Sequence, residues 1–185
     1  KFGGTSVGSV DSIRQIQHII GQQTDDCIVV VSALGGITDQ LLKAAHLALE
    51  AGEEYMEVYQ AIRCRHMDMV NTLITNPTTQ QMLCLELEGI LDELRSILFG
   101  VHLVKDLSNK TEAAIVSYGE RMSSRIVTAA LPGAVRKNSL QFIRTEHKQG
   151  QVLLNTELTE QLIRHAFSPM PHLSVVPGFI SRDSQ

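Results

Sequence analysis

Hydrophobic residues alternate between two patterns over the first fifty positions. In residues 10–20 they recur three and four positions apart, which predicts an amphipathic helix. Residues 27–32 (CIVVVS) form a short, continuous β-branched run, which is typical of a strand buried on both faces. A second amphipathic stretch follows, for which we expect Thr38 or Asp39 as the N-cap and an end near Gly52.

The middle of the chain carries the patterns of long helices. Residues 53–75 and 79–99 each show an apolar stripe, and an Asn-Pro pair separates them because proline cannot continue a helix. We therefore expect an αα-hairpin inserted at about 53–99. Residues 111–131 are predicted to be helical in two pieces, interrupted at Gly119.

The last third of the chain returns to shorter patterns. Residues 134–144 are weakly strand-like, 156–167 predict a helix, and 173–179 predict a strand that ends in a turn. The order strand, glycine loop, helix also occurs twice earlier, at 1–20 and 27–50. This alternation predicts a three-layer α/β/α fold with a mainly parallel sheet, whose loops bind ligands beyond the carboxyl ends of the strands.

Charge and composition exclude several classes of partner. A net charge of −4 and a pI near 6.0 give no basic footprint for nucleic acid or an anionic membrane. No apolar run reaches the roughly 18 residues that a membrane span needs. The three cysteines are widely spaced, which favours reduced thiols in a cytoplasmic protein. The histidines are scattered and HExxH and CxxC are absent, so we expect no metal site in the protein.

The opening segment KFGGTSV predicts a phosphate site. Gly3 and Gly4 allow another group to approach their N–H donors closely, and Lys1 supplies a mobile positive charge beside them. The alternative is a plain strand-to-helix turn beside a surface lysine. The P-loop pattern GxxxxGK[ST] and the dinucleotide pattern GxGxxG are both absent, so neither of these nucleotide sites is supported.

Three segments together resemble the aspartate kinases of the amino-acid kinase family. They are KFGGTSV at 1–7, VVVSALGGIT at 29–38 and VSYGERMSS at 116–124, in the order and spacing of that family. FIRT at 142–145 and VVPGFI at 175–180 resemble later family segments, so the resemblance covers essentially the whole chain. It implies an amino-acid-kinase-like fold and transfer of the ATP γ-phosphoryl group to the side-chain carboxylate of L-aspartate. The product would be 4-phospho-L-aspartate, for lysine, threonine and methionine biosynthesis.

The resemblance also implies which residues hold the nucleotide. Lys1 would be catalytic, stabilising charge on the transferring group, and Lys1, Gly3 and Gly4 would contact the phosphates of ATP, which carries Mg²⁺. This role agrees with the chemistry, because phosphoryl transfer depends mainly on positioning and charge neutralisation. The attacking carboxylate is already ionised at neutral pH, so no general base is required.

The aspartate site is likewise implied by the resemblance. Glu120 would pair with the α-ammonium group, Ser32 and Thr38 would orient the substrate, and Phe179 would lie at the aspartate pocket. Each has a simpler interpretation. Glu120 could only stabilise a helix N-terminus, Thr38 could only cap a helix, and Phe179 could only pack in the core.

We expect the fold to be incomplete at its C-terminal side. The family continues past a PGF turn into a Gly-Arg-Gly-Gly-Ser-Asp segment, whereas this chain continues as SRDSQ, so Arg182 is not assigned the role of the family's arginine. Residues 1–185 are thus interpreted as the N-terminal, amino-acid-binding part of a kinase domain. The 185 residues alone would be inactive.

Three further alternatives remain open from the sequence. The complete parent, expected to be a homo-oligomer, would be either a monofunctional kinase or a bifunctional aspartokinase–homoserine dehydrogenase. A different member of the fold, with acetylglutamate- or carbamate-kinase-like chemistry, would keep the glycine loops. It would not predict Ser32, Thr38 and Glu120 together. A non-catalytic binding fragment, using the αα-hairpin as a partner surface, is the third possibility.

Overall fold

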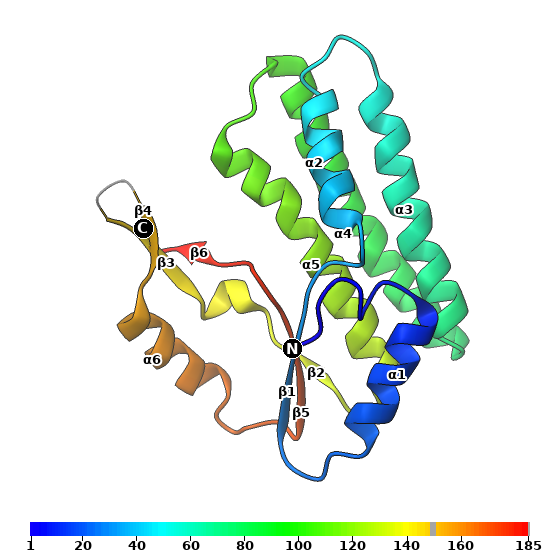
Figure 1. Ribbon diagram of the computed structural model, residues 1–185, viewed down its shortest axis with the longest axis vertical. Coiled ribbons are helices and arrows are strands. Elements are labelled where there is room, and N and C mark those ends of the chain that lie inside the picture. Colours follow the sequence, from blue (N-terminus) through cyan, green and yellow to red (C-terminus); the bar gives the residue numbers. More distant parts are fainter. Residues whose placement is uncertain (149–150, 185) are drawn as a thin grey trace.

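A computed structural model describes residues 1–148 and 151–184 (Figure 1). Its strands form two small sheets, and helices surround the first of them. The helices are α1 (Val10–Gly21), α2 (Ile37–Leu47), α3 (Glu54–Leu73), α4 (Pro77–Val104), α5 (Asn109–Ala130), the short 3₁₀ helix η1 (Ser139–Gln141) and α6 (Thr156–Ala166). The strands are β1 (Cys27–Val31), β2 (Val135–Arg136), β3 (Arg144–Lys148), β4 (Gln151–Leu154), β5 (Leu173–Pro177) and β6 (Arg182–Asp183).

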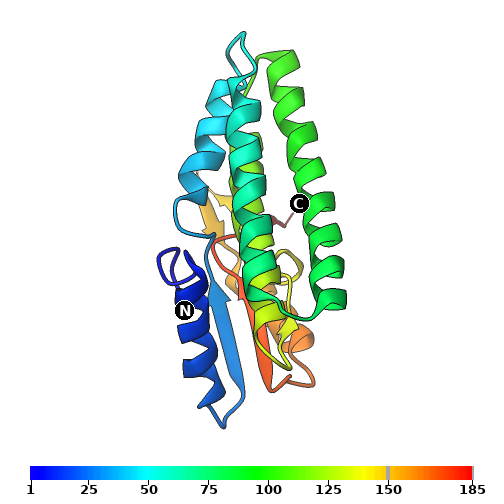
Figure 2. The same ribbon diagram turned by 90° about the vertical axis from the view of Figure 1, so that its right-hand side faces the viewer.

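The first sheet has the order β1-β5-β2, and all of its pairs are parallel. Figure 2 shows these strands side by side. The second sheet has the order β4-β3-β6, where β3 and β4 form an antiparallel hairpin and β3 pairs with β6 in parallel. The expected, mainly parallel arrangement is therefore confirmed.

The N-terminal segment adds an outer edge to the first sheet. Phe2 forms a parallel bridge with Val31. The Phe2 N–H donates to the Val30 carbonyl oxygen at 2.8 Å, and the Ser32 N–H donates to the Phe2 carbonyl oxygen at 3.2 Å. The opening glycine loop therefore lies beside the carboxyl end of β1.

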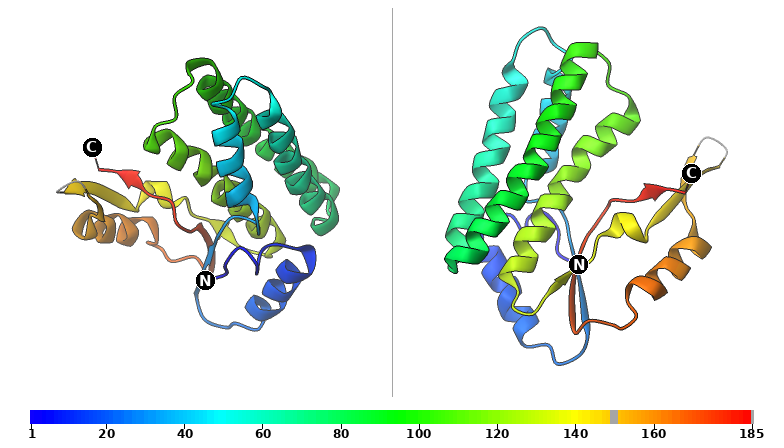
Figure 3. Two further views of the ribbon diagram at one scale, coloured as in Figure 1. Left: turned by 45° about the horizontal axis from the view of Figure 1, so that its top comes forward. Right: turned by 180° about the vertical axis from the view of Figure 1, so that it is seen from behind.

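Helices lie on both sides of the first sheet. Figure 1 shows α1 and α5 on one side and α6 on the other. Helix α5 packs on β1, β2 and β5, whereas α6 packs on β3 of the second sheet and Ile28 of β1 stays exposed. The long helices α3 and α4 form the expected hairpin, and α2 and α5 pack against them to complete a four-helix group (Figure 3). The core lies between this group and the sheet. It includes Val29 and Val31 of β1 and Ile115 and Met122 of α5, all 2 % exposed or less.

The predicted interruption of the helix at Gly119 is wrong. Helix α5 runs without a break through this position. The reason is tertiary packing, because a Cβ atom on Gly119 would lie 2.6 Å from the Cβ atom of Ala33. The glycine thus allows α5 to approach the loop after β1, at the cost of a weaker helix position.

The predicted caps and end of the next helix are also wrong. Helix α2 begins at Ile37, and its N-cap is Gly36 in the left-handed conformation (φ 80°). Thr38 and Asp39 therefore lie inside the first turn, and no side chain caps the helix. The helix ends at Leu47, before the expected end near Gly52, and helix α4 extends beyond both predicted ends.

Substituting Gly119 by alanine is expected to lower the free energy of unfolding. The added methyl group would clash with Ala33, and such overpacking costs about 1–3 kcal/mol. The matched control is Gly89→Ala, since Gly89 is an exposed position within α4 with open space around it. That variant should gain about 1 kcal/mol from helix propensity. Urea denaturation of both variants checks this, and equal effects would contradict the packing role of Gly119.

A histidine is buried without charge in the four-helix group. His66 of α3 is fully buried, and its Nδ1 atom lies 2.7 Å from the Ile62 carbonyl oxygen. Its Nε2 atom has no hydrogen-bond partner among the described residues. Burial lowers the pKa of His66 from 6.5 to about 4, despite the opposing effect of the bond to Ile62.

Stability should therefore fall in mildly acidic solution. Below pH 6.5 the unfolded chain protonates this imidazole while the folded chain does not, so the unfolded state binds more protons. Between pH 7 and pH 5 the free energy of unfolding should decrease by about 2 kcal/mol on this account. Denaturant titrations across this range are the measurement. His66→Gln should remove most of the slope and the exposed control His18→Gln should keep it, and identical slopes in the two variants would refute the assignment.

Candidate functional site

Two glycine loops meet at the carboxyl end of β1. A Cβ atom on Gly4 would lie 3.3 Å from the Ala33 carbonyl oxygen, and one on Gly35 would lie 3.1 Å from the Gly4 carbonyl oxygen. The opening loop and the loop after β1 are therefore in direct backbone contact, which side chains at these positions would prevent. The structure thus joins two of the three segments that the sequence singles out.

These loops carry backbone donors that the protein itself does not use. Within residues 1–148 and 151–184, the N–H groups of Gly4, Gly35 and Gly36 form no hydrogen bond. Gly36 is also the N-cap of α2, so the positive end of that helix dipole begins here. Free N–H groups at a helix N-terminus form a favourable place for an anion such as phosphate.

A buried carboxylate from α5 lies beside the same loops. Glu120 is 6 % exposed, and its Oε2 atom has no hydrogen-bond partner among the described residues. Burial raises the pKa of Glu120, while hydrogen bonds from the N–H groups of Ala33 and of Glu120 itself oppose this shift. No lysine, arginine or histidine in the described part of the chain pairs with it. A cationic group of a ligand would satisfy this carboxylate.

Close contacts fix α5 against the loop after β1. The Ser123 hydroxyl donates to the Ser32 carbonyl oxygen at 2.6 Å. One turn earlier, Gly119 lies against Ala33 without an intervening side chain. Both contacts flank Glu120, so its position relative to Ser32 is determined by the packing of α5. The sequence analysis included Ser123 in a motif but assigned it no role.

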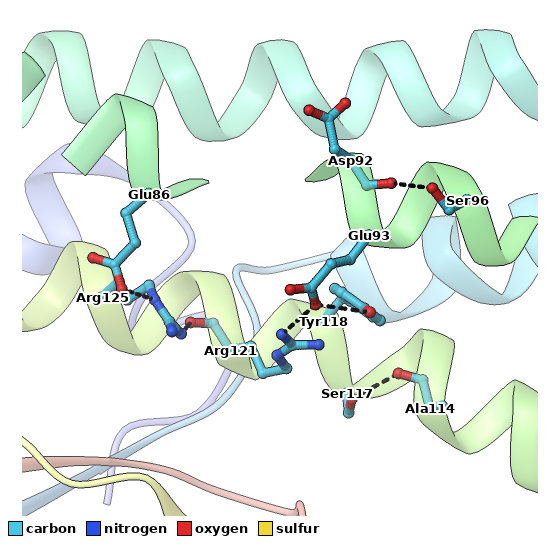
Figure 4. A network of polar contacts seen from close by, with 9 residues as sticks. All are labelled: Glu86, Asp92, Glu93, Ser96, Ala114, Ser117, Tyr118, Arg121 and Arg125. Carbon is cyan, nitrogen blue, oxygen red and sulfur yellow. Dashed lines mark hydrogen bonds and ion pairs between the residues drawn. The ribbon is translucent and has the colours of Figure 1, made fainter. Parts of the chain in front are cut away.

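A polar network holds α5 to α4 (Figure 4). The Arg121 guanidinium lies 2.7 Å from a Glu93 carboxylate oxygen, and the Tyr118 hydroxyl donates to the same oxygen at 3.2 Å. Arg125 pairs with Glu86 at 2.5 Å. Arg121 keeps the pKa of Glu93 below its usual value. These arginines, which the sequence analysis did not single out, are therefore engaged away from the Glu120 carboxylate.

Lys1 and Phe179 lie near the carboxyl end of β1, and both side chains are exposed. Lys1 is exposed and makes no ion pair within the described residues. The Gly178 N–H donates to the Val31 carbonyl oxygen at 2.8 Å, which brings the PGF turn to the carboxyl end of β1. Phe179 follows with φ 59° and a fully exposed side chain. Phe179 therefore does not pack in the core formed by the described residues, and its contact with a ligand stays a prediction.

The family model for the amino acid kinase family matches residues 1–185. The chain belongs to the amino acid kinase family. Aspartokinase 2, chloroplastic, of Arabidopsis thaliana is 32% identical to it, over 71% of this chain and 24% of that protein. Bifunctional aspartokinase/homoserine dehydrogenase 2 of Escherichia coli (strain K12) is 26% identical, over 100% of this chain and 23% of that protein. Both kinds of parent therefore occur among the relatives of this chain.

A solved structure shares the fold of this chain. Aspartokinase III of E. coli, in complex with lysine and aspartate, superposes with a TM-score of 0.85 and 25% identity, over 99% of this chain and 41% of that one. The expected fold class is thus confirmed. The chain spans about a quarter of the length of these curated relatives and about two-fifths of that solved chain. No helix in the described part of the chain is long and apolar enough to span a membrane.

Proposed function

We propose that the full-length gene product is an aspartate kinase, which transfers the γ-phosphoryl group of ATP to the side-chain carboxylate of L-aspartate. One observation carries the proposal. Glu120 presents a buried, unpaired carboxylate oxygen beside loops with free N–H donors. The site therefore offers a partner for a cation next to partners for an anion. An amino acid with a free ammonium group would supply the cation, and the phosphates of a nucleotide would supply the anion.

The same carboxylate argues against the other chemistries of the fold. The nitrogen of an N-acetylated amino acid is an amide without charge, and carbamate has no ammonium group. Neither would satisfy Glu120, and a buried charge left unpaired is costly. For aspartate, Glu120 would bind the α-ammonium, Ser32 and Thr38 would orient the substrate, and Phe179 would border the pocket.

The nucleotide phosphates would bind at the glycine loops. Lys1 would stabilise the charge on the transferring group, and Gly3 and Gly4 would let backbone donors reach the phosphates. No group of three or more His, Cys, Asp or Glu side chains suited to a metal lies in the part that the structure describes. We propose that Mg²⁺ binds with the phosphates of ATP, as the family resemblance implies. The solved complex of E. coli aspartokinase III with aspartate and ADP supports nucleotide binding in this fold.

Several finer assignments complete the proposal. The product, 4-phospho-L-aspartate, would serve lysine, threonine and methionine biosynthesis, as in the family that the motifs resemble. We place the enzyme in the cytoplasm, which its unpaired cysteines Cys27, Cys64 and Cys84 support. We further propose that it assembles as a homo-oligomer, which light scattering of the purified gene product would test.

A substrate panel tests the function directly. The purified gene product is incubated with ATP and Mg²⁺ and with L-aspartate, N-acetyl-L-glutamate or carbamate, and ADP release is followed. We expect turnover with L-aspartate alone. Preference for either of the other acceptors would replace the proposal with that chemistry. Absence of turnover with all three would favour a non-catalytic binding role.

A further inference from the structure

One arginine of the helical hairpin joins the two glycine loops. The Nη2 atom of Arg65, on α3, lies 3.0 Å from the Gly8 carbonyl oxygen and 3.0 Å from the Gly35 carbonyl oxygen. A single nitrogen therefore donates to both loops, although Arg65 is 57 and 30 residues away from them in the sequence. Arg65 forms no ion pair with any other described residue, so its charge is directed at these two carbonyl groups.

The two carbonyl groups have equivalent places in the fold. Gly8 immediately precedes Ser9, the N-cap of α1, and Gly35 immediately precedes Gly36, the N-cap of α2. In a planar trans peptide, the C=O of one residue and the N–H of the next point in opposite directions. Holding the Gly35 carbonyl toward Arg65 therefore turns the free Gly36 N–H to the opposite side of that peptide.

The bridge between Phe2 and Val31 anchors the start of the opening loop to β1. Farther along, the two loops meet through glycine backbone, where a Cβ atom on Gly8 would lie 3.5 Å from the Gly35 nitrogen and one on Gly35 would lie 3.1 Å from the Gly4 carbonyl oxygen. Glycines have no side chains that could interlock at this contact. Hydrogen bonds from a charged donor are about twice as strong as neutral ones and are directional, so Arg65 adds a constraint where the glycines meet.

We propose that Arg65 is a positioning residue, which sets the N-terminal ends of α1 and α2 in one geometry so that both loops present their donors to the transferred phosphoryl group. The inference rests on the proposed kinase function for its catalytic readout. It also gives the helical hairpin a function, because Arg65 connects α3 to both glycine loops. Phosphoryl transfer is sensitive to such positioning, and a misplacement of about 1 Å can lower the rate about 10²-fold.

Three variants of the full-length gene product test the role in catalysis. Arg65→Met keeps an unbranched apolar stem but removes the hydrogen-bond donors, and kcat should fall by about tenfold to 10²-fold. Arg65→Lys should recover most of the lost rate, since one ammonium nitrogen can replace the single nitrogen that serves both carbonyls. Arg63→Met is the matched control, because Arg63 is on the same helix and pairs only with Glu88.

A second readout does not depend on activity. Amide hydrogen exchange, measured by mass spectrometry on peptides covering residues 3–9 and 33–37, should be faster in Arg65→Met than in the wild type or in Arg63→Met. An unchanged exchange rate together with an unchanged kcat would overturn the proposal, as would equal effects of the two methionine variants. If the wild type phosphorylates no aspartate while the exchange difference appears, the kinase function fails and the positioning role stands.

Discussion

Glutamine in place of Glu120 is expected to weaken the binding of L-aspartate by about 2–5 kcal/mol, or roughly 30-fold to 4,000-fold in Kd. The substitution keeps the shape of the side chain and removes the charge that would pair with the α-ammonium group. The effect should be large because Glu120 is 6 % exposed, so water cannot replace the lost partner. ATP affinity should change little, since the phosphates would bind at the glycine loops.

Calorimetric titration of the purified gene product with L-aspartate, and separately with ATP, is the measurement. Glu112→Gln is the matched control, since Glu112 is in the first turn of the same helix and pairs with His46. The control should bind aspartate like the wild type. If Glu120→Gln binds aspartate with unchanged affinity, Glu120 has only a structural role and the proposed substrate site is lost.

Alanine in place of Lys1 is expected to lower kcat by about 10²-fold or more. In the proposed mechanism the ammonium group acts on charge that develops as the phosphoryl group transfers, so its loss affects the transition state more than the bound substrate. The KM for aspartate should stay within about threefold of the wild type. Steady-state kinetics with both substrates varied gives these values separately.

Lys43→Ala is a suitable comparison for this experiment. Lys43 is an exposed lysine on α2, outside the glycine loops. Its substitution should leave both kinetic constants near those of the wild type. A Lys1→Ala enzyme with normal kcat and a raised KM for aspartate would instead show that Lys1 contributes to substrate binding and not to phosphoryl transfer.

The order and type of the elements could be predicted from the sequence because they depend on local patterns. The CIVVV run gave a strand, and the Asn76-Pro77 pair marked the boundary between two helices, where Asn76 caps α4. The predictions failed where distant contacts override local preference. Gly119 suggested a break, but the contact with Ala33 explains the glycine and the helix continues through it.

Only part of the candidate site could be predicted from the sequence. Motifs identified Lys1 and Glu120, yet no local pattern shows that the Glu120 carboxylate is buried with an open oxygen. That property depends on the packing of α5 against the loop after β1. No sequence pattern indicated a role for Arg65, because its role depends on hydrogen bonds to two carbonyl groups that lie far from it along the chain.

The place of β5 in the first sheet governs the order in which this protein can assemble during synthesis. β5 comes late in the chain but lies between β1 and β2, which do not pair with each other. The helices α2 to α5 all precede it, so their mutual contacts become available while the sheet still lacks its central strand. Until Pro177 has left the ribosome, β1 has an open edge toward the place of β5. An open edge of this kind can pair with another chain, so the nascent protein is exposed to misassembly at β1 until β5 has formed.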